Sequence, residues 1–160
     1  MKKPMAGKKT RVFLDSNVLL SGLFSDKGAP RLLLDVLCLD LPVLAGVTGQ
    51  FNVTELERNL RKKMPAVLPI YRAYFPKLKL EIIPFPSKGD VRRLAGAATA
   101  KDIPVLASAI SGDADYLVTG DKKLYLSAKE KHKLPFKIVS PPEFLRSILP
   151  EILKSLGQKH

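Results

Sequence analysis

Short apolar runs of strand length alternate along the chain with longer segments whose apolar residues recur at helical spacing. The first run, Arg11 to Leu14 (RVFL), ends at Asp15, and the segment after it repeats its apolar residues as a helix does. We expect strands at 11–14, 42–47, 78–85, 116–118 and 136–139. We expect helices at 17–24, 31–39, 48–63, 90–100, 103–111 and 141–156, the last of them disturbed at Pro150.

Two helix starts carry candidate capping residues. Ser16 or Asn17 is the expected cap of the first helix, and Asp90 is the expected cap of the helix at 90–100. The stretch 65–77 contains three prolines and is expected to be helical only in pieces.

The order of the predicted elements determines the expected fold class. Strands that alternate with helices form a mostly parallel sheet, and the connecting helices cover both of its faces. We therefore predict an α/β fold, a three-layer α/β/α domain with a mostly parallel central sheet. At 160 residues the chain has the length of one domain. We expect a flexible basic arm at 1–10, the domain at 11–149 and a C-terminal tail at 150–160.

Acidic residues stand next to these predicted elements. Asp15 directly follows the first strand, and Asp121 follows the strand 116–118 across a Thr-Gly turn. Glu55 lies in the helix after the second strand, and Asp102 precedes the helix that leads into 116–118. Ligands bind parallel sheets at the carboxyl ends of the strands. The sequence therefore predicts that these four carboxylates converge at one edge of the sheet.

Converging carboxylates call for a cation. Two unit charges about 4 Å apart repel by roughly 4 kcal/mol at an effective dielectric near 20, so a cation among them or protonation is required. Hard divalent cations prefer oxygen ligands and also bind substrate phosphates, which favours Mg²⁺ or Mn²⁺. The sequence contains no cluster of His and Cys residues that would indicate a zinc site. His132 and His160 are interpreted as solvated surface residues, and Cys38 as a buried core thiol.

The overall charge adds an expected partner. The formal net charge is +12, which favours a polyanion such as nucleic acid. Apolar residues make up 46% and charged residues 26% of the chain, the balance of a globular protein. No apolar run is long enough for a membrane helix, the basic start lacks the apolar region of a signal peptide, and the one cysteine gives no reason to infer an oxidising compartment. We therefore expect a cytoplasmic protein that does not bind membranes.

Three blocks of sequence carry the acidic residues in a fixed order. They are RVFLDSNVLLSG from Arg11, TELERNLRKK from Thr54 and KDIPVLASAISGDADYLVTGDKKL from Lys101. In this order the blocks resemble the PIN domain family, and most closely its toxin-like prokaryotic members. The similarity runs from about residue 11 to residue 145. The proline-broken segment 65–76 and the basic N-terminal arm depart from the family pattern.

The resemblance implies a function and a set of site residues. It implies a PIN-like endoribonuclease that uses Mg²⁺ or Mn²⁺ to hydrolyse single-stranded or structured RNA. The implied catalytic and metal-binding acids are Asp15, Glu55, Asp102 and Asp121, supported by Ser16, Asn17 and Thr119. Many relatives are toxins restrained by a small antitoxin, and PIN domains often dimerise, so an antitoxin and a second copy of the chain are the implied protein partners.

Several alternatives accompany this interpretation. Glu57 is a rival to Glu55, while Asp113 and Asp115 are interpreted as a loop residue and a strand-entry residue. A phosphatase of the haloacid dehalogenase type needs a second Asp two positions after the first, where this chain has Asn17. A receiver domain needs paired acids at the first strand, where this chain has only Asp15. A dinucleotide enzyme needs a Gly-rich turn after that strand, and this chain has none there. A non-catalytic PIN-like module that binds RNA or protein remains the alternative from another class.

Overall fold

A central sheet of five strands organises the protein in the computed structural model, which describes residues 8–123, 125 and 133–157. The strands lie in the order β3-β2-β1-β4-β5, and every neighbouring pair is parallel. The prediction of an α/β fold with a mostly parallel sheet is confirmed. The strands are β1 Thr10–Leu14, β2 Leu44–Gly49, β3 Glu81–Ile83, β4 Tyr116–Val118 and β5 Lys137–Val139.

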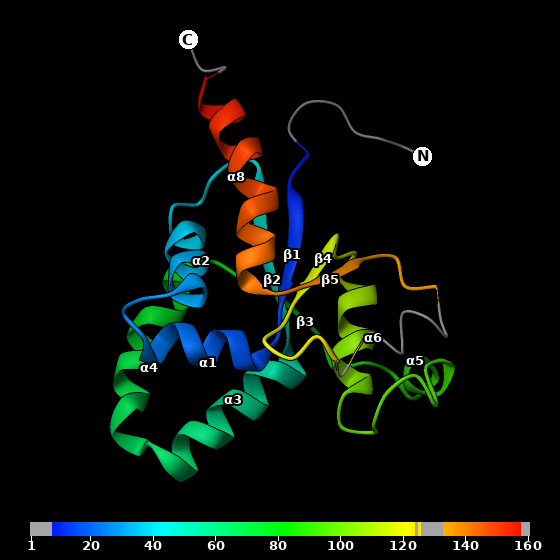
Figure 1. Cartoon of the computed structure of the whole chain (residues 1–160). Helices are drawn as coiled ribbons and strands as arrows, with labels where there is room; N and C mark the ends of the chain where they lie inside the picture. The colour runs from blue at the N-terminus through cyan, green and yellow to red at the C-terminus, as the bar shows by residue number, and fades with distance from the viewer. Residues whose placement is uncertain (1–7, 124, 126–132, 158–160) are drawn as a thin grey trace.

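Helices cover both faces of this sheet (Figure 1). Successive side chains of β1 point to opposite faces, so Val12 and Leu14 join one apolar cluster and Phe13 joins the other. Residues of α1, α2, α4 and α8 pack in the first cluster, and residues of α6 in the second. The α-helices whose bounds fall in the described residues are α1 Ser16–Phe24, α2 Ala29–Cys38, α3 Gln50–Lys63, α4 Leu68–Tyr74, α5 Lys88–Arg93, α6 Ile103–Ser111 and α8 Pro141–Gly157.

The predicted helix at 90–100 is wrong in its bounds and in its cap. Helix α5 is short and begins at Lys88, because Ser87 and Asp90 form a capping box in which each side chain accepts a hydrogen bond from the backbone N–H of the other residue. Asp90 is therefore the third residue of the helix and not its cap. The helix ends before Gly96, whose φ of 82° lies in the left-handed region.

The predicted strand at 78–85 is confirmed only at β3. A 3-10 helix occupies Phe75–Leu78, and Lys79 follows it in the left-handed conformation with a φ of 52°. This turn delays the strand to Glu81. The prolines of the preceding stretch divide it into 3-10 helix Pro65–Val67, α4 and 3-10 helix Phe75–Leu78, as predicted.

The division into arm, domain and tail stays a prediction. Helix α8 continues through Pro150 to Gly157. Residues 1–7 of the predicted arm and residues 158–160 of the predicted tail lie outside the described residues, as do His132 and His160. Among the helices of the described part, none combines the length and apolar character needed to cross a bilayer.

The start of α8 carries a second capping box. The backbone N–H of Ser140 donates to Glu143 Oε1 at 2.8 Å, and the Glu143 N–H donates to Ser140 Oγ at 3.3 Å. Lys122 Nζ also lies 2.9 Å from both carboxylate oxygens of Glu143. The Ser140 hydrogen bond first, and the Lys122 hydrogen bond next, lower the pKa of Glu143 from 4.5 to about 2.

We expect Glu143→Gln to destabilise the protein near neutral pH and to have a much smaller effect on stability near pH 2. Because the pKa is lower in the folded protein, the charged Glu143 stabilises the fold above pH 4.5, and this contribution is lost as the pH falls from 4.5 toward 2. Urea unfolding of the parent and the variant across this range measures the difference. An equal difference at both ends of the range would contradict the expectation.

Candidate functional site

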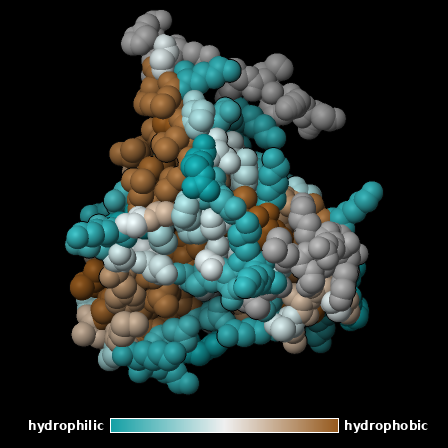
Figure 2. Space-filling model, viewed as in Figure 1, coloured by the Kyte–Doolittle hydropathy of each residue, from teal (hydrophilic) through white to brown (hydrophobic). Residues whose placement is uncertain are grey.

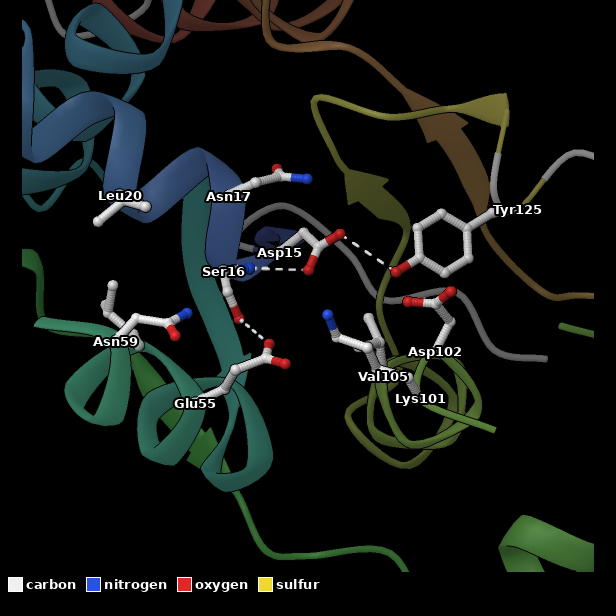
Figure 3. A pocket seen from close by; sticks show the side chains of 11 residues that line it. Asp15, Ser16, Asn17, Leu20, Glu55, Asn59, Lys101, Asp102, Val105 and Tyr125 are labelled. Atoms are coloured by element: carbon white, nitrogen blue, oxygen red, sulfur yellow. Dashed lines mark hydrogen bonds between the residues drawn. The ribbon is translucent and has the colours of Figure 1, made fainter. Parts of the chain in front are cut away.

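The carboxyl ends of β1 and β4 lie next to each other at the centre of the sheet. From β1 the chain leads through helices to β2 on one side, while β4 leads to β5 on the other, so this is the switch point of the strand order. A cavity of about 220 Å³ opens here, and Asp15, Glu55 and Asp102 line it (Figure 3). Three of the four predicted acids therefore meet at one cavity.

Asp15 occupies the first position after β1 and is the N-cap of α1, which corrects the expectation that Ser16 or Asn17 caps this helix. Its side chain is only 6% exposed. Oδ1 accepts hydrogen bonds from the backbone N–H of Ser16 at 2.8 Å and from Asn52 Nδ2 at 3.4 Å. Oδ2 accepts from the hydroxyls of Thr119 at 2.9 Å and Tyr125 at 3.2 Å. The buried carboxylate is thus held in one orientation by four donors.

Thr119 connects the end of β4 to the end of β1. The Thr119 hydroxyl is fully buried and donates to Asp15, while it accepts from the backbone N–H of Asp121 at 3.1 Å and from Asn17 Nδ2 at 3.4 Å. Asn17 Oδ1 in turn accepts from the Gly120 N–H at 2.9 Å. Thr119 and Asn17 therefore fix the turn after β4 against the start of α1.

Glu55 and Glu57 lie on different sides of α3. Glu55 lines the cavity, and its Oε1 accepts a hydrogen bond from Ser16 Oγ at 3.2 Å (Figure 3). Glu57 Oε2 instead accepts from the hydroxyl of Tyr71 at 2.9 Å, and Glu57 is not among the residues that line the cavity. The structure thus places Glu55, and not its rival, beside Asp15.

Asp102 and Lys101 approach the cavity from the start of α6. Asp102 is the N-cap residue, but its side chain makes no capping hydrogen bond; its Oδ2 accepts from Thr99 Oγ1 at 2.7 Å. Lys101 lines the same cavity. A carboxylate that is not needed to cap its helix remains available to a ligand in the cavity.

Asp121 is the predicted acid that does not line this cavity. It is exposed, and it lines a neighbouring cavity of about 330 Å³ that also contains Gly120 and Asn17. Asn17 borders both cavities. Within the described residues, no three His, Cys, Asp or Glu side chains are close enough together to form a metal site. The four-residue ligand set stays a prediction.

The other two predictions for acids of this region are consistent with the structure. Asp113 lies in the turn after α6 with a φ of 53°. The Asp115 N–H donates to the Arg11 carbonyl, and Asp115 Oδ2 accepts from the Arg11 N–H at 2.8 Å. Asp115 therefore leads into β4 beside β1.

Two residues of the site were not indicated by the sequence. Asn52 is fully buried on α3, and its Nδ2 donates to Ser16 Oγ at 3.0 Å and to Asp15. Tyr125 is 1% exposed and lines the cavity (Figure 3). The only available signal for Asn52 was its position three residues before Glu55, which places both on one side of a helix. Tyr125 lies beyond the last recognisable motif residue.

The electrostatics of the cavity are dominated by burial and by negative charge. Burial raises the pKa of Asp15 above its usual 3.8, and the charge of Glu55 adds to the rise, whereas the hydrogen bonds from Thr119, Ser16 and Tyr125 oppose it. Burial and the charges of Asp15 and Asp102 also raise the pKa of Tyr125. The phenol therefore stays protonated and acts as a donor.

No ion pair compensates these acids within the described part of the chain: Asp15, Glu55 and Asp102 have no Lys or Arg partner there. The cavity is lined by three carboxylates and by the side-chain oxygens of Ser16, Asn17, Asn59 and Tyr125, with no His or Cys among its lining residues. The most buried carboxylate, Asp15, is disfavoured as an anion. This chemistry fits a hard divalent cation.

Known proteins place this architecture in a family. Residues 11–123 match the PIN domain family. No curated protein matches the chain. The fold is similar to VapBC2 from Rickettsia felis, whose crystal structure contains a DNA fragment from the VapBC2 promoter. The TM-score is 0.57, and the identity is 18% over 82% of this chain and 98% of that chain. It is also similar to PAE2754 from Pyrobaculum aerophilum, with a TM-score of 0.54 and 18% identity over 91% of this chain and 94% of that chain.

At 18% identity the two structural likenesses show the fold alone. The match of residues 11–123 covers more than half of the sequence, and it includes the segments that bring Asp15, Glu55 and Asp102 to one cavity. The protein belongs to the PIN domain family.

Proposed function

We propose that the protein is an endoribonuclease that depends on Mg²⁺ or Mn²⁺ and hydrolyses RNA phosphodiester bonds. The proposed metal ligands and catalytic residues are Asp15, Glu55, Asp102 and Asp121. The observation that carries the proposal is the buried Asp15 carboxylate, which shares a cavity with Glu55 and Asp102 and has no cationic partner in the described residues. Membership of the PIN domain family supports the same chemistry.

A bound divalent ion would supply an activated water and would neutralise charge on the phosphate and on the departing 3′-oxygen. Hydrogen bonds from neighbouring residues of the chain orient the carboxylates that would hold this ion. Thr119 orients Asp15, and Ser16 orients Glu55 through its hydroxyl at 3.2 Å. Lys101, which lines the cavity, is placed to attract a phosphate.

Basic residues continue from the cavity along α3. This helix carries Glu55 at the cavity and ends with Arg61, Lys62 and Lys63 in its last turn. Together with the net charge of +12, this arrangement supports binding of a polyanion. RNA affinity should therefore fall steeply as the salt concentration rises.

The proposed biological form is a toxin paired with an antitoxin, acting in the cytoplasm. Helix α8 exposes Leu149, Leu153 and Leu156 at helical spacing, and Figure 2 shows apolar surface along this helix. This surface is the proposed contact for an antitoxin or for a second copy of the chain, and the likeness to VapBC2 supports a paired protein. Light scattering of the purified protein, alone and after co-expression with the neighbouring reading frame, tests both partners.

RNA end-mapping tests the proposed activity. We expect the protein with Mn²⁺ to cut single-stranded RNA, leaving 5′-phosphate and 3′-hydroxyl ends, and to lose this activity in EDTA. DNA of the same sequence serves as the comparison substrate. RNA binding without cleavage in Mn²⁺ would contradict the proposal and would identify a non-catalytic binding module.

A further inference from the structure

The carboxylate of Asp15 has no free position for another partner. An ionised carboxylate has about four acceptor positions, two on each oxygen. Ser16 and Asn52 donate to Oδ1, and Thr119 and Tyr125 donate to Oδ2. A cation that binds Asp15 directly must therefore take the place of one of these four donors.

Three of the four donors are held in place by other parts of the fold. The Ser16 donor is a backbone N–H at the start of α1, at 2.8 Å from Oδ1. The Thr119 hydroxyl also accepts from the Asp121 N–H and from Asn17, which leaves Asp15 as the acceptor for its proton. Asn52 is fully buried and donates to Ser16 Oγ at 3.0 Å in addition to Asp15.

Tyr125 differs from the other side-chain donors in where it lies. Tyr125 lines the cavity that contains Glu55 and Asp102, whereas neither Thr119 nor Asn52 lines it. Figure 3 shows the phenol reaching Asp15 from the side on which Asp102 lies. The bond from Tyr125 is 3.2 Å long, against 2.9 Å for the Thr119 bond to the same oxygen. The acceptor position that faces the cavity is thus the one that Tyr125 occupies.

We infer that the Tyr125 hydroxyl occupies the position on Asp15 Oδ2 that a divalent cation needs, and that Tyr125 leaves this carboxylate when the cation binds. The inference rests on the proposed metal site. It makes Tyr125 a positioning residue that lowers the affinity of the site for metal. Thr119, in contrast, orients the same carboxylate without lining the cavity.

The inference predicts that Tyr125→Phe binds Mn²⁺ more tightly than the parent, by about tenfold, because binding no longer breaks a hydrogen bond to a charged acceptor. Isothermal titration calorimetry with MnCl₂ measures this affinity without substrate or turnover. Thermal unfolding without metal confirms that each variant folds.

Tyr71→Phe is the matched control. Tyr71 is also a buried tyrosine that donates to a carboxylate, Glu57 Oε2 at 2.9 Å, but Glu57 does not line the cavity. Its removal should leave Mn²⁺ affinity unchanged. The chain has four tyrosines and no tryptophan, so release of one phenol also gives a near-ultraviolet difference spectrum on Mn²⁺ addition. This signal should persist in Tyr71→Phe and vanish in Tyr125→Phe.

The Asp15→Asn protein separates failure of this inference from failure of the proposed function. If Asp15→Asn abolishes Mn²⁺ binding but Tyr125→Phe binds as the parent does, or more weakly, the metal site stands and the inference about Tyr125 is wrong. If the parent and Asp15→Asn both bind Mn²⁺ and do so with the same affinity, the ion does not use Asp15, and both proposals fall. If Tyr125→Phe binds Mn²⁺ while neither the parent nor Asp15→Asn binds it measurably, the inference about Tyr125 is supported.

Discussion

Asp15→Asn is expected to reduce RNA cleavage by at least about 100-fold. Loss of a residue that only orients a metal ligand already costs roughly 10–100-fold, and Asp15 is itself the proposed ligand. Asparagine preserves the size of the side chain and keeps an oxygen for the Ser16 N–H, so the start of α1 is retained. The rate constant for cleavage of labelled RNA under single-turnover conditions measures the loss. Cleavage equal to that of the parent would show that the acidic cavity is not the active site.

The charge of Asp15 also makes the stability of the parent depend on pH when metal is absent. Burial raises the pKa of Asp15 above 3.8 in the folded protein. A raised carboxyl pKa contributes stability below pH 3.8 that is lost as the pH rises through the folded-state pKa, so at neutral pH the ionised Asp15 destabilises the fold. Asparagine removes this charge. We therefore expect Mn²⁺ to raise the melting temperature of the parent at neutral pH and to leave that of Asp15→Asn unchanged.

The parts of this site that follow the strands directly could be predicted from the sequence. Asp15 and Thr119 each come immediately after a strand, β1 and β4, and parallel strands bring their carboxyl ends to one edge of the sheet. Glu55 could be located to the correct helix but not separated from Glu57 by physical argument, because two residues of one helical turn differ only in direction. The packing of Tyr71 against α3 settles their directions.

Other features depend on contacts that no local pattern encodes. The sequence predicts that Asp121 joins the other acids, and this stays a prediction: the turn through Gly120 is held by Asn17, and Asp121 lines the neighbouring cavity. Asn52 and Tyr125 reach Asp15 across sequence separations of 37 and 110 residues. A buried polar residue of this kind is recognised by its partners, and the sequence does not show which partners it has.

Thr119→Val is expected to reduce RNA cleavage by about 10–100-fold, the usual cost of removing a group that orients a metal ligand. Valine has nearly the same shape and fills the fully buried position, but it cannot donate to Asp15 Oδ2 or accept from the Asp121 N–H. Asp15 then loses its shortest side-chain hydrogen bond, and the turn after β4 loses its link to β1. Single-turnover cleavage and Mn²⁺ calorimetry measure the two consequences.

Thr119→Ser is the matched control, because serine keeps the hydroxyl and loses only a methyl group, at a cost of about 1 kcal/mol in stability. We expect Thr119→Ser to cleave RNA within a few-fold of the parent. Equal losses in the serine and valine variants would mean that the methyl group, and not the hydroxyl, supports the site. If both proposals are correct, the two donors to Asp15 Oδ2 have opposite effects on Mn²⁺ affinity. Removing the Thr119 hydroxyl, which does not line the cavity, weakens binding because the carboxylate is no longer oriented. Removing the Tyr125 hydroxyl, on the cavity side, strengthens binding because its position on the carboxylate is no longer occupied.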